Sequence, residues 1–381
     1  MKLPIVQFTE EQENFRLEVR SFLKKHLKIG TFKTKCDSWL SGSDPTFSKI
    51  IANQGWIGMT WPKKYGGAER SSIDRYILTE EFLAAGAPVA AHWFADRQTG
   101  PLLLRFGTEE QRQFFLPKIV KGECFFAIGL SEPNSGSDLA SVSTRATKVD
   151  GGWLVNGAKT WTSNAHHAHY MVTLVRTEQL DPAKKHKGLS QLIIDLHADG
   201  VEIKPIRYLT GEHHFNDVFF ENVFVPDNMV VGTLGNGWEQ GLAELAFERS
   251  GPERILSTFP LLNELVEELK KQGDLIGLEE ASKLIAEMWG LRNLSIGVAK
   301  VLEEGGEVAI PAALVKSIGT KFEQKVPEVA RLLVQTMPRL EAERKFDRYM
   351  AESILHSPGF TIRGGTSEVL YGVVAKGVVA K

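Results

Sequence analysis

The chain has 381 residues, 43% hydrophobic and 24% charged, which is the composition of a globular protein with a buried core. Its formal net charge of -2 provides no basic field to attract nucleic acid, and no apolar run approaches the roughly 18 residues needed to cross a membrane. The two cysteines, Cys36 and Cys124, form no paired motif, so we expect a reduced compartment and a cytoplasmic protein.

The first third of the chain, residues 1–122, is expected to form a helical domain. Thr9 and Gln12 have the spacing of a capping box, and apolar residues follow them at helical intervals. Thr108 precedes two glutamates, which favour the positive end of a helix dipole, so another helix should begin there. Further helices are predicted over 47–54 and 72–85.

Residues 123–232 change character, with short β-prone runs separated by turn signals. Asp150-Gly151-Gly152 and Asn156-Gly157 are typical of hairpin turns. We therefore predict a central antiparallel β-barrel or sandwich domain. Its strands are expected over 125–130, 143–148, 153–155, 170–176, 189–196, 201–203 and 218–220.

Residues 233–381 return to a helical pattern and should form a C-terminal helical bundle, so the fold class is α+β with three domains. Glycines and prolines punctuate the long amphipathic segments. The helices are expected over 261–269, 278–300, 312–336 and 345–355.

Two stretches of the β region carry candidate chemistry. In 129–141 a strand ends in a loop of glycine and hydroxyl residues, which suits a large anionic ligand or, alternatively, a simple turn between strands. In 156–164, Trp161 is flanked by hydroxyl residues, so its indole could cover a planar ring system, or it could be an ordinary core tryptophan.

Together these stretches resemble the acyl-CoA dehydrogenase family. Residues 131–141 fit the first signature of that family position by position, and further matches occur in the same order along the chain. The resemblance implies helical, β-barrel and helical domains, FAD as cofactor, an acyl-CoA substrate and an electron-transferring flavoprotein as acceptor. The further matches are 55–58, 64–67, 106–111, 116–118, 122–123, 216–226, 235–238 and 363–368.

The resemblance also implies roles for single residues. Leu130, Ser131, Trp161, Thr162 and Ser163 match residues around the flavin ring, and Ser137 matches a serine near both the flavin pyrophosphate and the acyl-CoA. At the other end of the chain, Gly365, Thr366 and Glu368 match the loop and helix start that meet the ADP half of FAD, where a helix N-terminus favours phosphate.

The reaction of the family needs a carboxylate to remove the α-proton while the β-hydrogen leaves as hydride to flavin N5. Gly364 stands where many relatives have that base, but its backbone N–H could still donate to the thioester oxygen. Glu248 fits the base position of a second branch, with Arg249 as the adjacent substrate-binding residue and Glu244 in reserve. The alternative for Glu248 is a plain surface glutamate.

The C-terminal third departs from the family pattern. The Arg-x-x-Phe-Gly and Gln-x-x-Gly-Gly-x-Gly stretches, which normally help to bind FAD across a subunit interface, are missing between about 260 and 340. The adenylate is then held differently, or the chain works in a hetero-oligomer. We expect a homo- or hetero-oligomer, dimer or tetramer; the alternatives are a partner-dependent, catalytically incomplete subunit, or a flavin oxidase or reductase on the same scaffold.

Histidines cluster at 166–169 and 213–214, but their setting does not suggest the supported ligand set of a metal site, and we predict no metal. The basic run 184–187 reads as a solvated loop, with CoA phosphate contact as the alternative.

Overall fold

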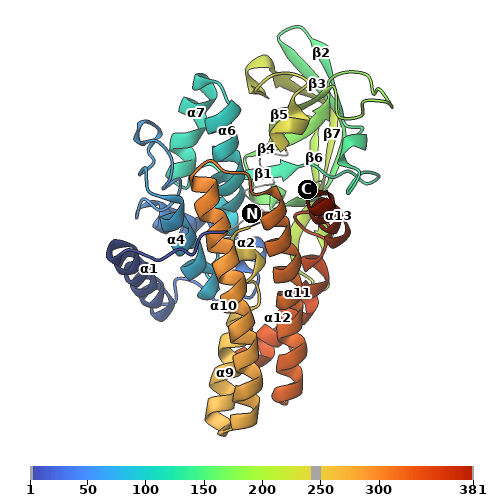
Figure 1. Cartoon of the computed structure of the whole chain (residues 1–381). Coiled ribbons are helices and arrows are strands. Elements are labelled where there is room, and N and C mark those ends of the chain that lie inside the picture. Colours follow the sequence, from blue (N-terminus) through green and yellow to red (C-terminus); the bar gives the residue numbers. More distant parts are fainter. Residues whose placement is uncertain (1–2, 242–249, 380–381) are drawn as a thin grey trace. The chain divides into compact units, whose positions relative to one another are not determined.

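The computed structural model describes residues 3–241 and 250–379. The chain divides into two compact units. We call the first, Met1–Gly42, Arg70–Val89 and Ala246–Lys381, the helical unit, and the second, Ser43–Glu69 and Ala90–Leu245, the sheet unit. Helices at the N-terminus, a central mixed sheet and a helical C-terminal region confirm the predicted fold class (Figure 1).

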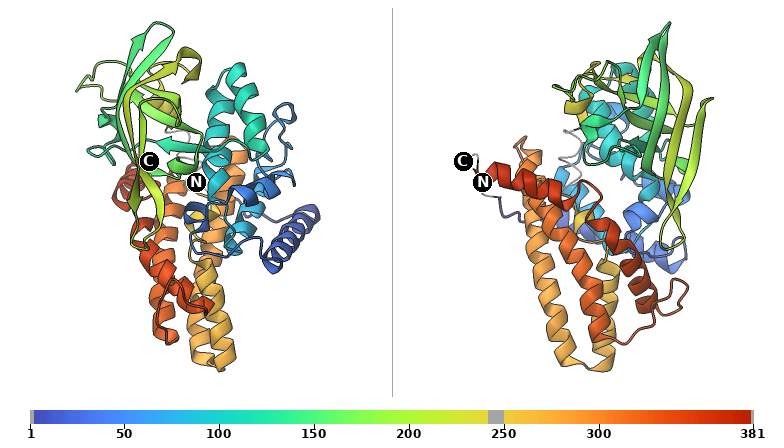
Figure 2. Two further views of the ribbon diagram at one scale, coloured as in Figure 1. Left: turned by 180° about the vertical axis from the view of Figure 1, so that it is seen from behind. Right: turned by 90° about the vertical axis from the view of Figure 1, so that its right-hand side faces the viewer.

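The helical unit is built on long amphipathic helices. In both views of Figure 2, helices α9 to α12 run side by side, and they bury leucine, alanine and aromatic side chains against one another. Its described helices are α1 (Glu10–Lys28), α2 (Ser38–Ser41), α4 (Ser72–Ala84), α9 (Phe259–Gln272), α10 (Leu275–Glu303), α11 (Ala309–Leu333), α12 (Lys345–Phe360) and α13 (Ser367–Val379).

Among the described residues, the sheet unit combines one eight-stranded sheet with several short helices. The strand order is β6-β7-β3-β2-β4-β5-β8, and β1 lies beside β4. Its helices are α3 (Pro45–Ala52), α5 (Ala90–Phe94), α6 (Gly100–Phe106) and α7 (Glu109–Val120). Its strands are β1 (Phe126–Gly129), β2 (Arg145–Val149), β3 (Gly152–Ser163), β4 (Tyr170–Arg176), β5 (Leu189–Asp195), β6 (Val201–Arg207), β7 (His213–Pro226) and β8 (Val230–Val231).

The sheet is mixed because two strands pair with β4 in parallel. Most neighbouring strands are antiparallel, but β1 pairs with β4 in parallel over its whole length, and β2 does so at one residue pair, Arg145 with Arg176. The chain leaves β1 through a long loop and the β2–β3 hairpin before it returns as β4, and a connection of that length permits a parallel pair. The sheet buries an apolar core that includes Val155, Met171, Leu192, Val218 and Val223.

Local sequence signals account for several element ends. The capping boxes at Thr9 with Gln12 and at Thr108 with Gln111 are both formed, which confirms these helix starts. Among the described residues, no helix combines the length and the apolar character needed to cross a membrane.

One predicted turn is wrong. Asn156 and Gly157 lie inside β3, where the register against β7 shifts, so they form a bulge and the strand continues through them. Gly157 has a φ of 143°, and a Cβ there would lie 2.7 Å from the Thr144 Cα, so glycine is needed for close approach of the strands.

Candidate functional site

The signature loop follows β1 and runs from Leu130 to Ser141. Its first turn is closed by two backbone hydrogen bonds between Glu132 and Ser135, at 2.8 and 3.0 Å. Leu130 packs against a small apolar cluster of the sheet unit, while Ser137 is exposed on the loop. The first turn of the loop is therefore held by hydrogen bonds, and Ser137 is exposed to solvent.

The loop is joined directly to the strand that carries Trp161. The Thr160 N–H donates to the Ser131 carbonyl at 2.9 Å, so the residues that follow β1 are hydrogen-bonded to β3. Two segments that sequence analysis assigned separately to the flavin ring thus lie side by side in one unit.

Trp161 stands on a second bulge of β3. The register against β7 shifts between Lys159 and Thr162, and Trp161 has a φ of 55°. That left-handed conformation is costly for a residue with a Cβ, and it is found mainly where a structural or functional demand imposes it. The indole is 57% exposed and meets Phe215 edge-on, so it is not a core tryptophan.

Polar side chains hold the bulge on both sides. Before it, the Thr160 hydroxyl donates to Asp217 Oδ1 at 2.6 Å. After it, the buried Asn216 donates from Nδ2 to the Thr162 carbonyl at 3.0 Å, and its Oδ1 lies 2.7 Å from His213 Nε2. These contacts fix where the Trp161 side chain points.

A buried ion pair lies beneath the same two segments. Lys159 Nζ is 2.7 Å from Glu132 Oε1 and 3.2 Å from the Leu130 carbonyl. Glu132 also accepts from the Ser143 N–H and hydroxyl and from the Thr144 N–H, at 2.6, 2.8 and 2.9 Å. Sequence reasoning missed this pair, although both residues belong to the matched segments, because a charged side chain is usually exposed.

The two charges shift each other's ionisation. Burial lowers the pKa of Lys159 to about 8, even though Glu132 opposes that shift. Burial alone would raise the pKa of Glu132, but the Lys159 charge and the hydrogen bonds to the carboxylate lower it to about 2. Glu132 is therefore ionised near neutral pH, and Lys159 is held as its counter-ion.

In the helical unit, the predicted ADP-binding segment forms the turn before α13. Gly364 and Gly365 have φ values of 68° and 95°, which explains glycine at both positions. The Thr366 hydroxyl accepts from the Val369 N–H at 3.3 Å and so caps α13, and Lys316 Nζ donates to the Gly365 carbonyl at 2.9 Å. Glu368 is exposed in the first turn of the helix.

Arg363, just before this turn, is anchored by buried charges. Its Nη1 lies 2.6 and 2.7 Å from the two carboxylate oxygens of Asp37, and its Nη2 donates to Ser257 Oγ at 2.8 Å. Burial opposes ionisation of Asp37, but the charge of Arg363 and the bond to His356 lower the pKa of Asp37 well below its usual range.

Glu323 of α11 belongs to the same network. It lies 3.7 Å from Arg363 and accepts from the Ser257 N–H at 2.8 Å. Complete burial raises the pKa of Glu323 to about 7, and Arg363 only partly offsets that effect. The network was not predicted, because its members are far apart in the sequence.

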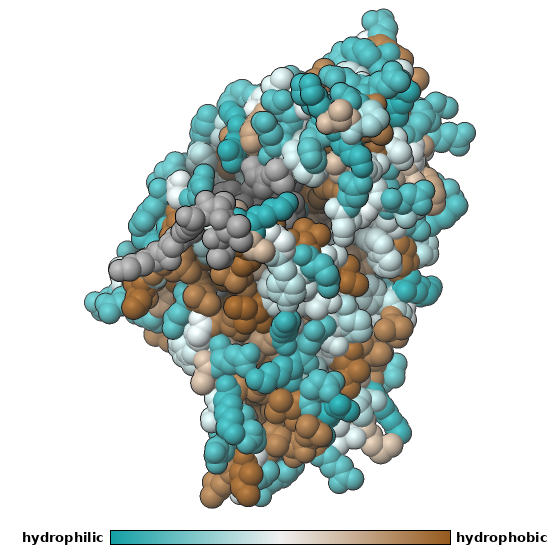
Figure 3. Space-filling model, turned by 45° about the vertical axis from the view of Figure 1, so that its right-hand side comes forward, coloured by the Kyte–Doolittle hydropathy of each residue, from teal (hydrophilic) through white to brown (hydrophobic). Residues whose placement is uncertain are grey.

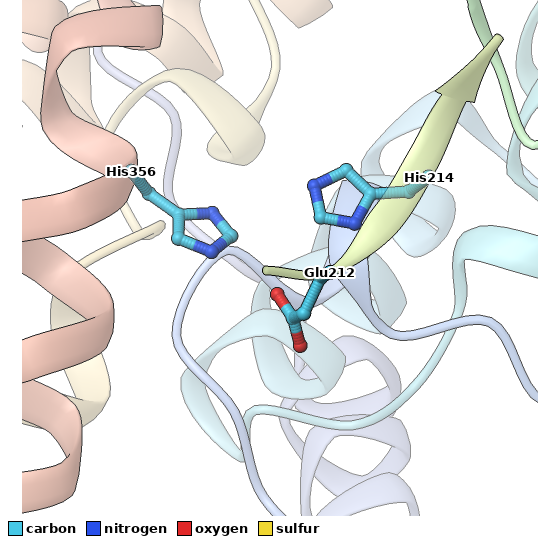
Figure 4. A group of neighbouring side chains, drawn as sticks. All are labelled: Glu212, His214 and His356. Atoms are coloured by element: carbon cyan, nitrogen blue, oxygen red, sulfur yellow. The ribbon is translucent and has the colours of Figure 1, made fainter. Parts of the chain in front are cut away.

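Histidines occur in both units. His356 lies on α12 in the helical unit, where its Nδ1 is 3.2 Å from Asp37 Oδ2 (Figure 4). His214 lies on β7 in the sheet unit and Glu212 just before that strand (Figure 4). In the sheet unit, His166 and His213 stack with ring centroids 3.9 Å apart. Burial together with neighbouring histidines lowers the pKa of His166 to about 4.

The predicted base Glu248, its neighbour Arg249 and the reserve Glu244 lie outside the described residues. The described chain resumes at Ser250, whose carbonyl accepts from the Ser295 hydroxyl of α10. Pro252–Arg254 then forms a short buried 3₁₀ turn.

Each unit, taken by itself, has residues that fit a part of FAD. The Thr162 hydroxyl is fully buried and has no hydrogen-bond partner among the described residues, beside an exposed indole suited to a planar ring. In the helical unit, the Ser367 hydroxyl at the start of α13 is buried and likewise unpartnered within the described chain, at a helix end that favours phosphate. Ser163, half-buried at the end of β3, adds a further hydroxyl.

Comparison with known proteins gives a consistent result. The models of the acyl-CoA dehydrogenase N-terminal and middle domains match residues 9–123 and 127–223. Acyl-CoA dehydrogenase IpdE1 of Mycolicibacterium smegmatis is 33% identical over 97% of each chain. Acyl-CoA dehydrogenase FadE34 of Mycobacterium tuberculosis is 34% identical over 86% of this chain, which spans only 45% of that protein.

Solved structures share the fold over the whole chain. The structure titled Tcur3481-Tcur3483 steroid ACAD has a TM-score of 0.86 and 26% identity, and covers 100% of this chain and 99% of that one. The ChsE4-ChsE5 complex from Mycobacterium tuberculosis has a TM-score of 0.83 and 26% identity, with the same coverage of 100% and 99%.

Proposed function

Because the chain belongs to the acyl-CoA dehydrogenase family of FAD-dependent oxidoreductases, we propose that it desaturates an acyl-CoA thioester between Cα and Cβ. The observation that carries the proposal is Trp161, an exposed indole held in a left-handed bulge beside the buried Thr162 hydroxyl, which has no hydrogen-bond partner in the described part of the chain. Bound FAD supplies the acceptor of the β-hydride.

The chain's own residues then take separate tasks. Trp161 covers one face of the flavin ring, and Leu130, Ser131, Thr162 and Ser163 bind its edge. Ser137 serves the pyrophosphate and the acyl-CoA. In the helical unit, Gly365, Thr366 and Glu368 meet the ADP half, and the Gly364 N–H donates to the thioester oxygen, where negative charge develops as the α-proton leaves.

Glu248 is the proposed base, with Arg249 binding substrate beside it. We expect Glu248→Gln to retain FAD and acyl-CoA while losing most turnover, because the amide cannot accept the α-proton. Glu244→Gln, four residues earlier in the sequence, is the matched control. Normal turnover in Glu248→Gln together with an inactive Glu244→Gln would move the assignment to Glu244.

For the substrate we propose a bulky, ring-bearing acyl-CoA. The support is the whole-length likeness to the structure titled as a steroid ACAD, at 26% identity. Short, medium and branched acyl-CoAs serve as the competing classes in the test.

A second candidate is a subunit that needs a different partner chain to hold FAD. It is favoured by the two missing FAD-binding stretches and by the likeness to the ChsE4-ChsE5 complex. Hydrophobic side chains of α10 and α11, including Leu275, Ile276, Leu314 and Ile318, are exposed, and the face in Figure 3 shows such surface among polar groups. Exposed apolar surface is common where subunits meet.

The test is the visible spectrum of the purified chain, titrated without oxygen with each class of acyl-CoA. A flavin band bleached by the ring-bearing class supports the dehydrogenase and its substrate. If another class of acyl-CoA bleaches the flavin band, that class becomes the proposed substrate instead. A protein that stays colourless with added FAD would favour the partner-dependent subunit, and peroxide formed in air without an added acceptor would favour an oxidase. Reoxidation by an electron-transferring flavoprotein tests the proposed acceptor.

A further inference from the structure

The buried pair of Glu132 and Lys159 joins the two segments assigned to the flavin ring. Glu132 follows Ser131 in the signature loop, and Lys159 lies two residues before Trp161 on β3. The side chain of Lys159 is fully buried and that of Glu132 is 4% exposed. Lys159 also donates to the Leu130 carbonyl, so one ammonium contacts the loop at two points.

Such a pair is costly to bury. Removing two charges from water costs several kcal/mol per ion, and apolar replacements of similar size are often neutral or stabilising. Stability alone is therefore a weak reason for this pair. Its directional contacts nevertheless specify one loop position, because they link the loop to β3 next to the bulge that presents Trp161.

We propose that Glu132 and Lys159 are positioning residues that fix the signature loop against β3, and so set the spacing between the Leu130–Ser131 backbone and the Trp161 indole for FAD. The inference rests on the proposed assignment of those residues to the flavin. Neither charged group needs to touch the cofactor, since the pair acts through the backbone on which the contacting residues stand.

Glu132 and Lys159 differ in the number of hydrogen bonds that each keeps when the other is replaced. Without Lys159, Glu132 keeps its three donors from Ser143 and Thr144. Without Glu132, Lys159 keeps one hydrogen bond within the described chain, to the Leu130 carbonyl. An ammonium buried with one neutral acceptor is less well satisfied than a carboxylate with three donors, so loss of Glu132 should disturb the loop more.

The test compares Glu132→Gln, Lys159→Met and the double variant in the full chain. Lys148→Met, which removes an exposed pair with Asp227 in the same sheet, is the matched control. Three quantities are measured: the urea midpoint of the apoprotein, the dissociation constant of FAD, and the visible flavin spectrum. The last two report loop geometry, and a purely structural role would move the first.

We expect the double variant to keep the wild-type urea midpoint while its FAD dissociation constant rises about tenfold, equivalent to about 1.4 kcal/mol. Its flavin bands should also shift. Glu132→Gln should weaken FAD binding more than Lys159→Met, and Lys148→Met should match the wild type.

The opposite results are distinguishable. A double variant that binds FAD like the wild type with an unchanged spectrum overturns the inference. A urea midpoint that falls together with FAD affinity would mean that the pair contributes to stability instead. If the double variant fails to fold, the single variants decide: weaker FAD binding in Lys159→Met than in Glu132→Gln overturns the inference. A wild-type chain without any FAD binding would overturn the site assignment itself, whereas FAD binding without substrate bleaching would overturn only the proposed reaction.

Discussion

In the sheet unit, the residues assigned to FAD lie on β3 and in the loop after β1, where backbone hydrogen bonds hold them above one buried ion pair: Thr160 bonds to Ser131, and β3 pairs with β7 on either side of the bulge. In the helical unit, the assigned residues form a turn between helices, and side-chain charges hold it through Arg363 and Asp37. A backbone ladder tolerates changes of side chain, whereas removing one partner of a buried ion pair leaves the other charge uncompensated. The two halves should therefore respond differently to mutation.

The largest effect is expected from Asp37→Asn. It leaves Arg363 buried without its main counter-charge, which should lower the free energy of unfolding by about 3–5 kcal/mol in urea titrations near neutral pH. The folded-state pKa of Asp37 is depressed, so its contribution is present above the unfolded pKa of about 4 and is lost as pH falls below it. The difference from wild type should shrink in acid.

Glu328→Gln is the control, since it removes an exposed pair with Arg331 and should leave stability unchanged. Equal stability of Asp37→Asn and wild type at neutral pH would mean that the helical unit does not depend on this network.

Glu323→Gln should change the pH dependence of the helical unit. The folded-state pKa of Glu323 is raised to about 7, so between its unfolded value and 7 the folded state binds more protons and wild-type stability falls as pH rises. Glutamine removes this slope because it does not ionise. We expect the variant to match wild type near pH 5 and to exceed it by on the order of 2–3 kcal/mol near pH 8.

Parallel stability curves for the two proteins from pH 5 to 8 would contradict this account of Glu323. The conservative Glu323→Asp variant should retain a slope, since it keeps an ionisable carboxyl in the network.

Asn216→Ala tests whether the sheet unit also depends on a side chain. It leaves the Thr162 carbonyl and His213 without their bonds to Asn216, at a cost of about 2 kcal/mol in the free energy of unfolding. It should also weaken FAD binding, because the bulge loses its fixed direction. Asn156→Ala, which removes an exposed contact with Asn222 in the same sheet, is the control and should have the smaller effect. Equal effects of Asn216→Ala and Asn156→Ala on stability and FAD binding would mean that Asn216 does not hold the bulge.

The smallest effect concerns the backbone at Trp161. Glycine tolerates its φ of 55° and alanine does not, so the Trp161→Gly apoprotein should be more stable than Trp161→Ala by about 1 kcal/mol in urea unfolding. Both variants should bind FAD weakly, since both lack the indole. The same two substitutions at Thr160, which has no positive φ, should favour alanine. The same preference at both positions would argue against a strained bulge.

Much of the fold follows from local patterns in the sequence. Capping boxes mark the starts of α1 and α7, and short β-prone runs bounded by turn signals mark β4 and β5, because both signals depend on near neighbours. Asn156-Gly157 was misread as a turn because a bulge and a hairpin use the same glycine, and only pairing with β7 distinguishes them. The parallel pairing of β1 with β4 likewise depends on contacts far apart in sequence.

For the candidate site, too, the sequence predicts some features and not others. The family resemblance predicts Trp161 and its neighbours as flavin contacts, but no local pattern reveals that Lys159 reaches Glu132 or that Asp37 reaches Arg363. A charged residue is usually exposed, so burial of these side chains could be recognised only in three dimensions. The roles of all the candidate site residues, Glu248 and Arg249 among them, stay predictions.

The ion pair of Asp37 and Arg363 also has a consequence for biosynthesis. The two residues are separated by 326 positions, and the sheet unit lies between them in the chain. At about 5–20 residues per second, a ribosome takes roughly 16–65 s between making one and the other. During that interval the sheet unit can be complete while the Asp37 segment still lacks its partner, so this first segment is the one that a nascent-chain chaperone would need to shield.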